Sequence, residues 1–241
     1  MAKRALAYTI MALAVVASVV SLALFVGFPA GSLRLLRLEW PEPALLVWDA
    51  LLSFAFFLQH SVMVRRGFQA RVAGVIPPRY YRAVYSIASG VVLAAAVLLW
   101  QPSSIHLLVL AGPAHWLLQS GVVLAVALFA WGAIALRGFD FFGLASILAY
   151  LRGTEEKPPV FVARGPYRWV RHPFYLSVLV LIWSCPDLTA DRLLFNILWS
   201  AWVIVGTTFE EADLQSDFGE PYRNYRRRVP MLIPWRGPVA L

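Results

Sequence analysis

The sequence contains few charged residues and a single cysteine. Only 14% of its 241 residues are Asp, Glu, Lys or Arg, whereas about 25% is usual for a soluble domain. Cys185 cannot form a disulfide within the chain, and no Cys or His lies near it at the spacing of zinc ligands, so no metal site is predicted. The composition excludes a secreted disulfide scaffold, a disordered chain and a collagen-like fibre.

Apolar residues make up 60% of the chain, and the mean hydropathy is +0.68. A bilayer core is crossed by about 20 mostly apolar residues. The first apolar run is longer than the roughly 7 to 15 residues of a signal-peptide core, which indicates a retained membrane helix. The last apolar stretch is broken at Cys185-Pro186-Asp187, which predicts a helical hairpin with a short first arm. The sequence thus predicts an all-α, polytopic integral membrane protein with about six segments, at 6–28, 44–64, 81–100, 116–136, 174–185 and 191–213.

The positions of the basic residues predict the orientation of these segments. Lys and Arg accumulate in cytoplasmic loops. With the amino terminus inside, 18 of the 21 basic residues fall on the cytoplasmic side, and only Arg34, Arg37 and Arg192 fall on the other. An even number of segments with both termini cytoplasmic is therefore expected. This distribution also explains the net charge of +8, so membrane lipids are expected partners and nucleic acid is not.

The densest polar cluster, residues 164–175, leads directly into the fifth segment. Gly165-Pro166 predicts a turn, and Pro173 suits the first turn of a helix, where its missing N–H is harmless. Arg171 and His172 are therefore expected at a helix N-terminus, which attracts a carboxylate or a phosphate. The alternative is that the arginines of this cluster only contact lipid headgroups.

Two further clusters follow the same hairpin. Glu210 and Glu211 close the last segment, where adjacent carboxylates are costly unless they are solvated or paired. Residues 172 and 211 lie at the same end of the two arms, so we expect the two clusters to face each other across one cavity; a solvated helix end is the alternative. The basic stretch 218–230 is either a helix lying on anionic lipid or a lid that carries an arginine over that cavity.

These motifs, in this order, resemble the isoprenylcysteine carboxyl methyltransferase-like superfamily of membrane methyltransferases. Upstream, the chain is also similar to the methanethiol S-methyltransferase branch and to NnrU-type membrane proteins. The residues that carry the resemblance are Gly165-Pro-Tyr-Arg-x-Val-Arg-His-Pro-x-Tyr175, Glu210-Glu211-x-x-Leu214, Phe218-Gly219-x-x-Tyr222-x-x-Tyr225, Val229-Pro230, Gln59-His60-Ser61-Val62-Met63, Arg82 with Tyr85, Trp100-x-Pro102 and Phe139-Asp140-Phe141-Phe142-Gly143-Leu144.

The resemblance implies that the carboxy-terminal motifs bind S-adenosylmethionine and that the methyl acceptor reaches it from the membrane. Arg171 suits the donor's carboxylate, and Glu210 or Glu211 suits its amino group and ribose hydroxyls. Nearby aromatic faces suit its sulfonium cation. No Gly-x-Gly-x-x-Gly follows a strand, which argues against a soluble Rossmann-type methyltransferase. The expected donor contacts are Tyr167, Arg171, His172, Pro173, Tyr175, Glu210, Glu211, Tyr225 and Arg228.

A thiol acceptor is mostly protonated at neutral pH, so a base is expected, and histidine titrates in this range. His172 and His60 are the candidates. Asp49, Asp140 and His60 could form a polar acceptor site, because ionisable groups within a membrane are functional candidates. The alternatives are a structural role for His60 and a purely structural ion pair between Arg82 and Asp140.

The sequence and the resemblance together predict a membrane enzyme that transfers a methyl group from S-adenosylmethionine to a small apolar thiol, with methanethiol giving dimethyl sulfide. Residues 1–136 are expected to form the amino-terminal helices and the acceptor side, and residues 137–241 the cytoplasmic loop, hairpin and tail of the donor site. A bacterial inner membrane is the expected location. The alternatives are carboxyl methylation of a prenylcysteine, methylation of a lipid, and a non-catalytic protein of the NnrU type.

Overall fold

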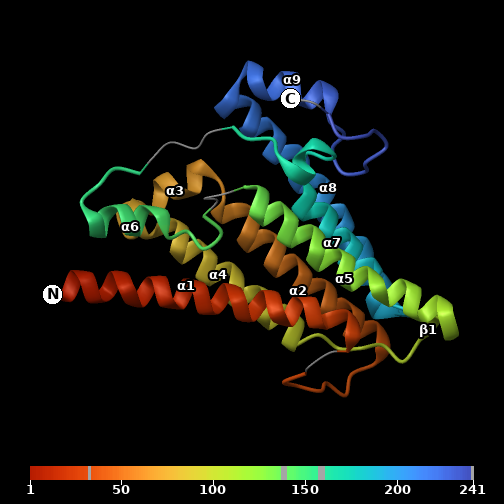
Figure 1. Ribbon diagram of the computed structural model, residues 1–241. Helices are drawn as coiled ribbons and strands as arrows, with labels where there is room; N and C mark the ends of the chain where they lie inside the picture. The colour runs from red at the N-terminus through yellow and green to blue at the C-terminus, as the bar shows by residue number, and fades with distance from the viewer. Residues whose placement is uncertain (32–33, 137–139, 157–160, 240–241) are drawn as a thin grey trace. The chain divides into compact units, whose positions relative to one another are not determined.

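The structure, a computed structural model, describes residues 1–31, 34–136, 140–156 and 161–239. These residues are almost entirely helical (Figure 1). A shorter apolar helix, α7 (Pro173–Trp183), stands where the short fifth segment is predicted. The helices in the described residues that are long and apolar enough to cross a membrane are α1 (Ala2–Gly27), α2 (Glu42–Met63), α4 (Pro78–Leu98), α5 (Gly112–Ala135) and α8 (Ala190–Phe218). Together these helices confirm the predicted all-α integral membrane fold.

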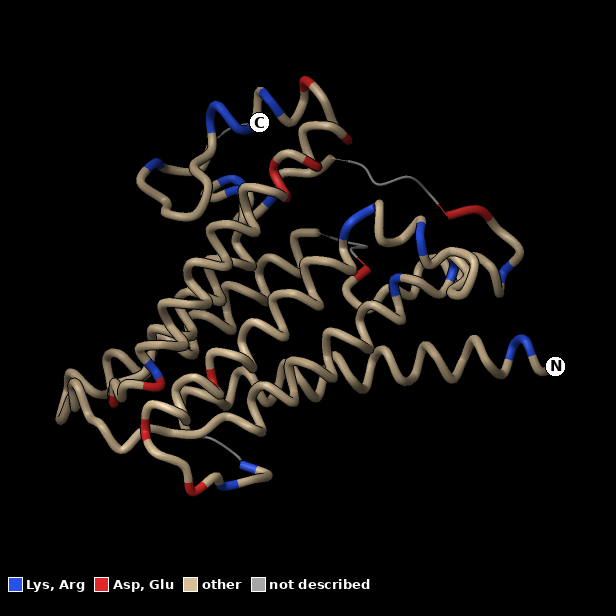
Figure 2. The backbone as a smooth tube through the Cα atoms, turned by 180° about the vertical axis from the view of Figure 1, so that it is seen from behind, with Lys and Arg blue, Asp and Glu red and all other residues tan. Residues whose placement is uncertain are grey.

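Short elements connect these helices. The tubes of the long helices carry few charged residues along their length, as membrane helices require (Figure 2). Three predictions fall on residues outside the described ranges: the cytoplasmic placement of Arg137 and Lys157, and the motif residue Phe139. The connecting elements are η1 (Phe28–Ala30), α3 (Arg66–Val72), β1 (His106–Val109), α6 (Ala145–Arg152), η2 (Gly165–Arg168), β2 (Asp187–Thr189) and α9 (Glu220–Arg228).

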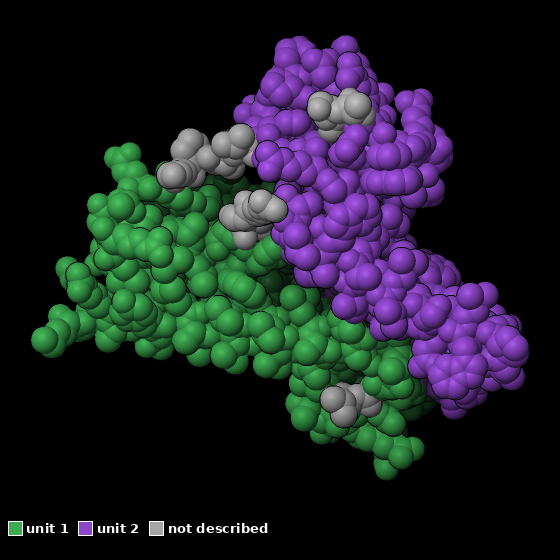
Figure 3. Space-filling model, viewed as in Figure 1, with its two compact units in different colours: residues 1–102, 140–158 green, residues 103–139, 159–241 purple. Residues whose placement is uncertain are grey.

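The chain forms two compact units (Figure 3). Unit 1 comprises Met1–Pro102 and Asp140–Pro158, and unit 2 comprises Ser103–Phe139 and Pro159–Leu241. Unit 2 includes α5 because that helix packs along α7 and against η2, whereas α6 packs on α1 and α4 in unit 1. The expected assignment of the acceptor side to residues 1–136 and of the donor site to residues 137–241 concerns function and stays a prediction.

In unit 1, α1 packs along α4, and α2 packs on α4 as well. The contact between α1 and α4 is close because it uses small residues. A Cβ on Gly90 would lie 2.7 Å from the carbonyl oxygen of Ala17, so only glycine fits there. Small residues give membrane helices this close backbone approach.

Asp49, one of the predicted acceptor-site residues, is fully buried in unit 1. One of its carboxylate oxygens accepts the backbone N–H of Gln101 at 2.9 Å. The Gln101 amide in turn donates to the carbonyls of Leu36 and Leu99. Asp49 therefore anchors the loops at one end of α2 and α4.

In unit 2, the hairpin arms α7 and α8 are joined by a turn and by β2, which pairs antiparallel with β1. Asp191 fixes this end because its carboxylate accepts the backbone N–H of Ser103 at 2.9 Å and the hydroxyl of Thr189 at 2.5 Å. The predicted break at Cys185-Pro186-Asp187 lies between the end of α7 and β2. At the other end of α8, α9 packs against it.

Candidate active site

The site in unit 2 begins at a tight turn before α7. Gly165 opens η2 with a φ of +55°, and a Cβ there would lie 2.9 Å from Ala135 on α5, so both the backbone angle and the space require glycine. Pro173 occupies the first turn of α7, and His172 precedes it as the N-cap residue. The predicted turn and helix start are confirmed.

A buried ion pair joins the two arms of the hairpin. The Nε of Arg171 donates to the Oε1 of Glu211 at 2.5 Å, and the Nη2 of Arg171 lies 2.5 Å from the same oxygen. The side chains of Arg171 and Glu211 are only 9% and 4% exposed. Arg171 also donates through Nη1 to the carbonyls of Arg226 and Val229, at 3.1 and 2.5 Å. The guanidinium is thus held rigidly on several sides.

His172 completes this cluster. Its Nε2 lies 3.2 Å from the Oε1 of Glu211, and its Nδ1 lies 3.9 Å from the Oε2 of Glu210. A carboxylate can only accept a hydrogen bond, so Nε2 must carry the proton in this contact. Nδ1 is then the nitrogen with a lone pair when the ring is neutral. The ring of Tyr175 lies 5.7 Å from the imidazole, between ring centres.

The helix α9 closes over the cluster. The Nε of Arg226 lies 3.1 Å from the second oxygen of Glu211, so this carboxylate is shared by two arginines and a histidine. The expected meeting of the two clusters is confirmed, but it is a direct contact and not a cavity, because the arginines are long enough to reach the carboxylate. The arginine of α9 that reaches Glu211 is Arg226, whereas Arg228 lines a neighbouring cavity.

The segment after α9 is tied to the residues before α7. The backbone N–H groups of Arg171 and His172 donate to the carbonyls of Pro230 and Met231, at 2.9 and 3.2 Å. Farther along, Val239 and Arg168 exchange two hydrogen bonds. The tail therefore holds α9 in place over the Arg171–Glu211 pair.

Three tyrosines lie in this region. The hydroxyl of Tyr225 donates to the carbonyl of Tyr167 at 2.7 Å. The hydroxyl of Tyr222, a residue that is 2% exposed, has no hydrogen-bond partner among the residues that the structure describes. Burial raises the pKa of all three phenols. The carboxylate of Glu210 raises the pKa of Tyr167 further, and that of Glu211 does the same for Tyr222. The three hydroxyls therefore keep their protons, and that of Tyr225 donates its hydrogen bond to Tyr167.

A cavity of about 660 Å³ lies next to α9. Two of the predicted donor contacts, Tyr225 and Arg228, line it, together with Arg164 and Asn224. Phe161 forms part of its wall and packs edge-on against Tyr222 and Tyr225, at 5.9 and 5.2 Å between ring centres. This cavity combines donors for an anion with aromatic faces. Asn224 and Phe161 belong to its lining but carry none of the predicted donor contacts.

The candidates in unit 1 do not form the predicted trio. The imidazole of His60 lies within hydrogen-bonding distance of the Tyr85 hydroxyl, 2.9 Å from Nε2. Asp49 is eleven residues earlier on α2, and a rise of 1.5 Å per residue separates the two by about 16 Å. Asp140 accepts the backbone N–H groups of Leu144 and Ala145 at 2.7 and 2.8 Å, so it supports the start of α6.

The proposed pair between Arg82 and Asp140 is not formed. Arg82 forms an ion pair with Glu156 instead. Gly143, in the loop after Asp140, has a φ of +70° and lies against the backbone of Arg82 and Ala83 on α4, where a side chain would not fit. The loop backbone thus lies beside α4, and the Asp140 carboxylate accepts N–H groups at the start of α6 instead of binding Arg82.

Curated relatives match most of the chain. The methanethiol S-methyltransferase of Pseudomonas deceptionensis is 36% identical over 201 residues, which cover 81% of this chain and 74% of that protein. Methanethiol S-methyltransferase 2 of Bradyrhizobium diazoefficiens is 36% identical over 77% of this chain and 72% of that protein. The protein-S-isoprenylcysteine O-methyltransferase of Schizosaccharomyces pombe is 35% identical over 83 residues, 33% of this chain and 35% of that protein.

No protein-family profile matches the chain, and no solved structure matches it. The two bacterial relatives are matched over more than two thirds of their own length at 36% identity. The chain therefore belongs to the methanethiol S-methyltransferase family of membrane methyltransferases and is itself a methyltransferase.

Proposed function

We propose that this enzyme transfers a methyl group from S-adenosylmethionine to methanethiol and releases dimethyl sulfide. The similarity to methanethiol S-methyltransferases over about four fifths of the chain carries this proposal. The cluster of Arg171, His172 and Glu211, buried between the hairpin arms, supports it from the structure. A bacterial inner membrane with both termini cytoplasmic is part of the proposal, in keeping with the distribution of basic residues.

The residues around the Arg171–Glu211 pair fit an S-adenosylmethionine molecule. Two arginines share one buried carboxylate, which leaves an excess of positive charge for the donor's own carboxylate. The Tyr222 hydroxyl is buried, protonated and without a partner in the described part of the chain, so it offers a further hydrogen bond. When bound, S-adenosylmethionine supplies an electrophilic methyl group on a sulfonium.

Glu210 and Glu211 take different parts in this arrangement. Both oxygens of Glu211 already contact cationic or N–H groups, so Glu211 organises the arginines. Glu210 is 44% exposed and is the better partner for the donor's amino group. Tyr167, Pro173, Tyr175 and Arg228 stay predicted donor contacts, as do Arg171, His172 and Tyr225.

On the acceptor side, a base must remove the thiol proton. Nδ1 of His172 can accept this proton when Nε2 donates to Glu211, and His60 with its Tyr85 contact is the second candidate. Most of the rate gain is expected from holding the thiol sulfur in line with the transferred methyl, a contribution of up to about 7 to 11 kcal/mol.

The test uses the full chain in detergent, with S-adenosylmethionine labelled on the methyl group. Labelled dimethyl sulfide from methanethiol is the expected product. A labelled methyl ester from farnesylated cysteine, with no dimethyl sulfide, would instead favour the prenylcysteine reaction that the 83-residue match leaves as an alternative. Calorimetry on the same sample measures donor binding, so a failure to bind the donor is separated from a wrong acceptor.

A further inference from the structure

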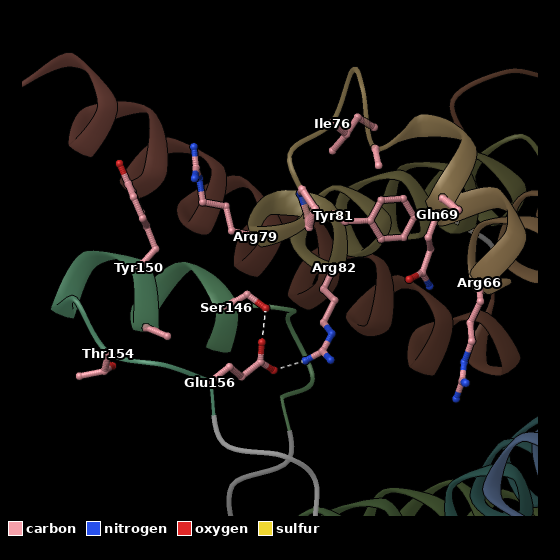
Figure 4. Close-up of a pocket in the computed structure, with 14 residues that line it drawn as sticks. Arg66, Gln69, Ile76, Arg79, Tyr81, Arg82, Ser146, Tyr150, Thr154 and Glu156 are labelled. Carbon is pink, nitrogen blue, oxygen red and sulfur yellow. Dashed lines mark hydrogen bonds and ion pairs between the residues drawn. The ribbon is translucent and has the colours of Figure 1, made fainter. Parts of the chain in front are cut away.

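A second cavity, of about 730 Å³, lies in unit 1, and none of its lining residues is among those proposed for methyl transfer. It is lined by α3, the first turn of α4, α6 and the segment after α6 (Figure 4). We call it the arginine cavity, because its fourteen lining residues include Arg66, Arg79 and Arg82 but only one carboxylate, that of Glu156.

That carboxylate is already engaged. One oxygen of Glu156 pairs with the Nη1 of Arg82, and the other accepts the hydroxyl of Ser146. Both contacts are drawn as dashed lines in Figure 4. Glu156 therefore balances Arg82 and does not offset the charge of Arg79.

Arg79 is held by aromatic rings. Its guanidinium lies 4.4 Å from the ring centre of Tyr150 and 5.2 Å from that of Tyr80. Within the described residues these rings, and no carboxylate, are its contacts. Stacking fixes a guanidinium in direction but uses none of its five N–H donors. Arg79 is thus oriented and ready to bind an anion.

The start of α4 adds to the positive charge. Its first turn contains Arg79 and no acidic residue, although the N-terminal end of a helix carries a partial positive charge and favours acidic side chains. An external anion would offset this unfavourable arrangement.

The position and the walls of the arginine cavity indicate the kind of anion. Pro78, which lines the cavity, is the first residue of α4, and α4 is long and apolar enough to cross a membrane. The cavity therefore lies where the helix leaves the bilayer. Apolar groups of Ala70, Ala73, Ile76 and Ala149 form other parts of its wall. Basic pockets at this depth suit lipid phosphates flanked by acyl chains.

We propose that the arginine cavity binds the phosphate headgroup of an acidic membrane phospholipid, with Arg79 as the principal phosphate donor. Arg66 and the N-terminal end of α4 contribute positive charge, and Arg82 and Glu156 form one side of the site. This proposal is independent of the methyl-transfer reaction.

The test titrates the detergent-purified full chain with dioctanoyl phosphatidylglycerol and dioctanoyl phosphatidylcholine, with bound lipid counted by native mass spectrometry. The variant is Arg79→Gln. The matched control is Arg152→Gln, which removes one charge from α6 at a position that does not line the cavity. Loss of charge-assisted hydrogen bonds should weaken phosphatidylglycerol binding about tenfold in Arg79→Gln. Arg152→Gln should stay within about twofold, since a single exposed charge contributes little.

Equal weakening in the two variants would overturn the proposal, because it would indicate general surface charge. Equal wild-type affinity for both lipids would overturn it as well. An excess of inorganic phosphate should not release the bound lipid. If phosphate alone displaced it, the ligand would be a soluble phosphate compound and the proposal would be overturned. If Arg79→Gln fails to fold, Arg79→Lys keeps the charge and should retain the preference for phosphatidylglycerol.

Discussion

Removal of the Tyr222 hydroxyl separates a binding role from a structural one. Tyr222 is 2% exposed, and its hydroxyl has no partner among the described residues. After burial, the charges that act on this phenol are those of Glu211, Arg171, Glu210 and Arg226. The hydroxyl therefore lies in the electric field of the proposed donor site. Tyr222→Phe removes this one oxygen and leaves the ring that packs against Phe161 and Tyr225.

Stability and donor affinity should change in opposite directions. A buried polar group without a partner costs about 1 to 3 kcal/mol, so its removal should stabilise the donor-free protein by up to that amount. For a chain of this size, 1 kcal/mol corresponds to a shift of about 2 to 4 °C in Tm. A hydrogen bond to a charged ligand group is worth about 1.5 to 3 kcal/mol, so the Kd for S-adenosylmethionine should rise about 10- to 150-fold.

Tyr225→Phe, three residues away on the same helix, is the matched control for the stability measurement. Its hydroxyl donates to the carbonyl of Tyr167 at 2.7 Å, so the same substitution should lower Tm. Thermal unfolding at a fixed scan rate and calorimetric titration with S-adenosylmethionine measure the two quantities. An unchanged Kd in Tyr222→Phe would refute the binding role, and a lower Tm would show that the hydroxyl has a partner in the donor-free protein.

Four further substitutions test other parts of the structure. Arg226→Gln should weaken S-adenosylmethionine binding about tenfold in calorimetry, because its contact with Glu211 is lost. The neighbouring Arg227→Gln should leave the binding unchanged. Equal effects of the two substitutions would contradict the role of Arg226. Glu211→Ala should destabilise the protein by about 3 to 5 kcal/mol in thermal unfolding, because it leaves buried arginine charge unpaired; a normal Tm would argue against the buried pair. His60→Ala should spare donor binding and lower turnover of methanethiol, and unchanged turnover would return this histidine to a structural role. Gly90→Leu should destabilise unit 1 by at least about 1 to 3 kcal/mol, since a Cβ meets the backbone of α1 at 2.7 Å; an unchanged Tm would refute the close helix contact.

The membrane helices and the hairpin were predictable because their signals are local. An uncharged apolar run longer than a bilayer core leaves few alternatives, and every long segment matches an observed helix to within a few residues. Pro173 marks the first turn of α7, and Pro186 follows the end of α7. The meeting of residues 172 and 211 was predictable from the same hairpin, since both positions are on the side away from the turn that joins its arms.

The partners of the polar groups in unit 1 were not predictable in this way. Asp49 and His60 are both intramembrane polar residues of α2, but their places along the helix bring them to different neighbours, Gln101 and Tyr85. Asp140 binds nearby backbone N–H groups, whereas Arg82 reaches Glu156, which is 74 residues later in the sequence. Such choices depend on packing at long sequence separation, which residue types alone do not determine.

The helical period of α9 could have predicted from the sequence which of its arginines lies on the buried face, next to Glu211. Successive residues turn by about 100° around a helix axis. Tyr222, Tyr225, Arg226 and Val229 therefore fall within one sector of about 100°, and the two tyrosines and the valine are buried. Arg226 shares that sector and reaches Glu211. Arg228 lies outside it, on the side of Asn224, and lines the cavity with that residue and Tyr225. One short basic helix thus divides its arginines between two tasks: Arg226 neutralises the buried carboxylate that orients Arg171, and Arg228 remains beside the cavity, where an anionic group of a ligand can reach it.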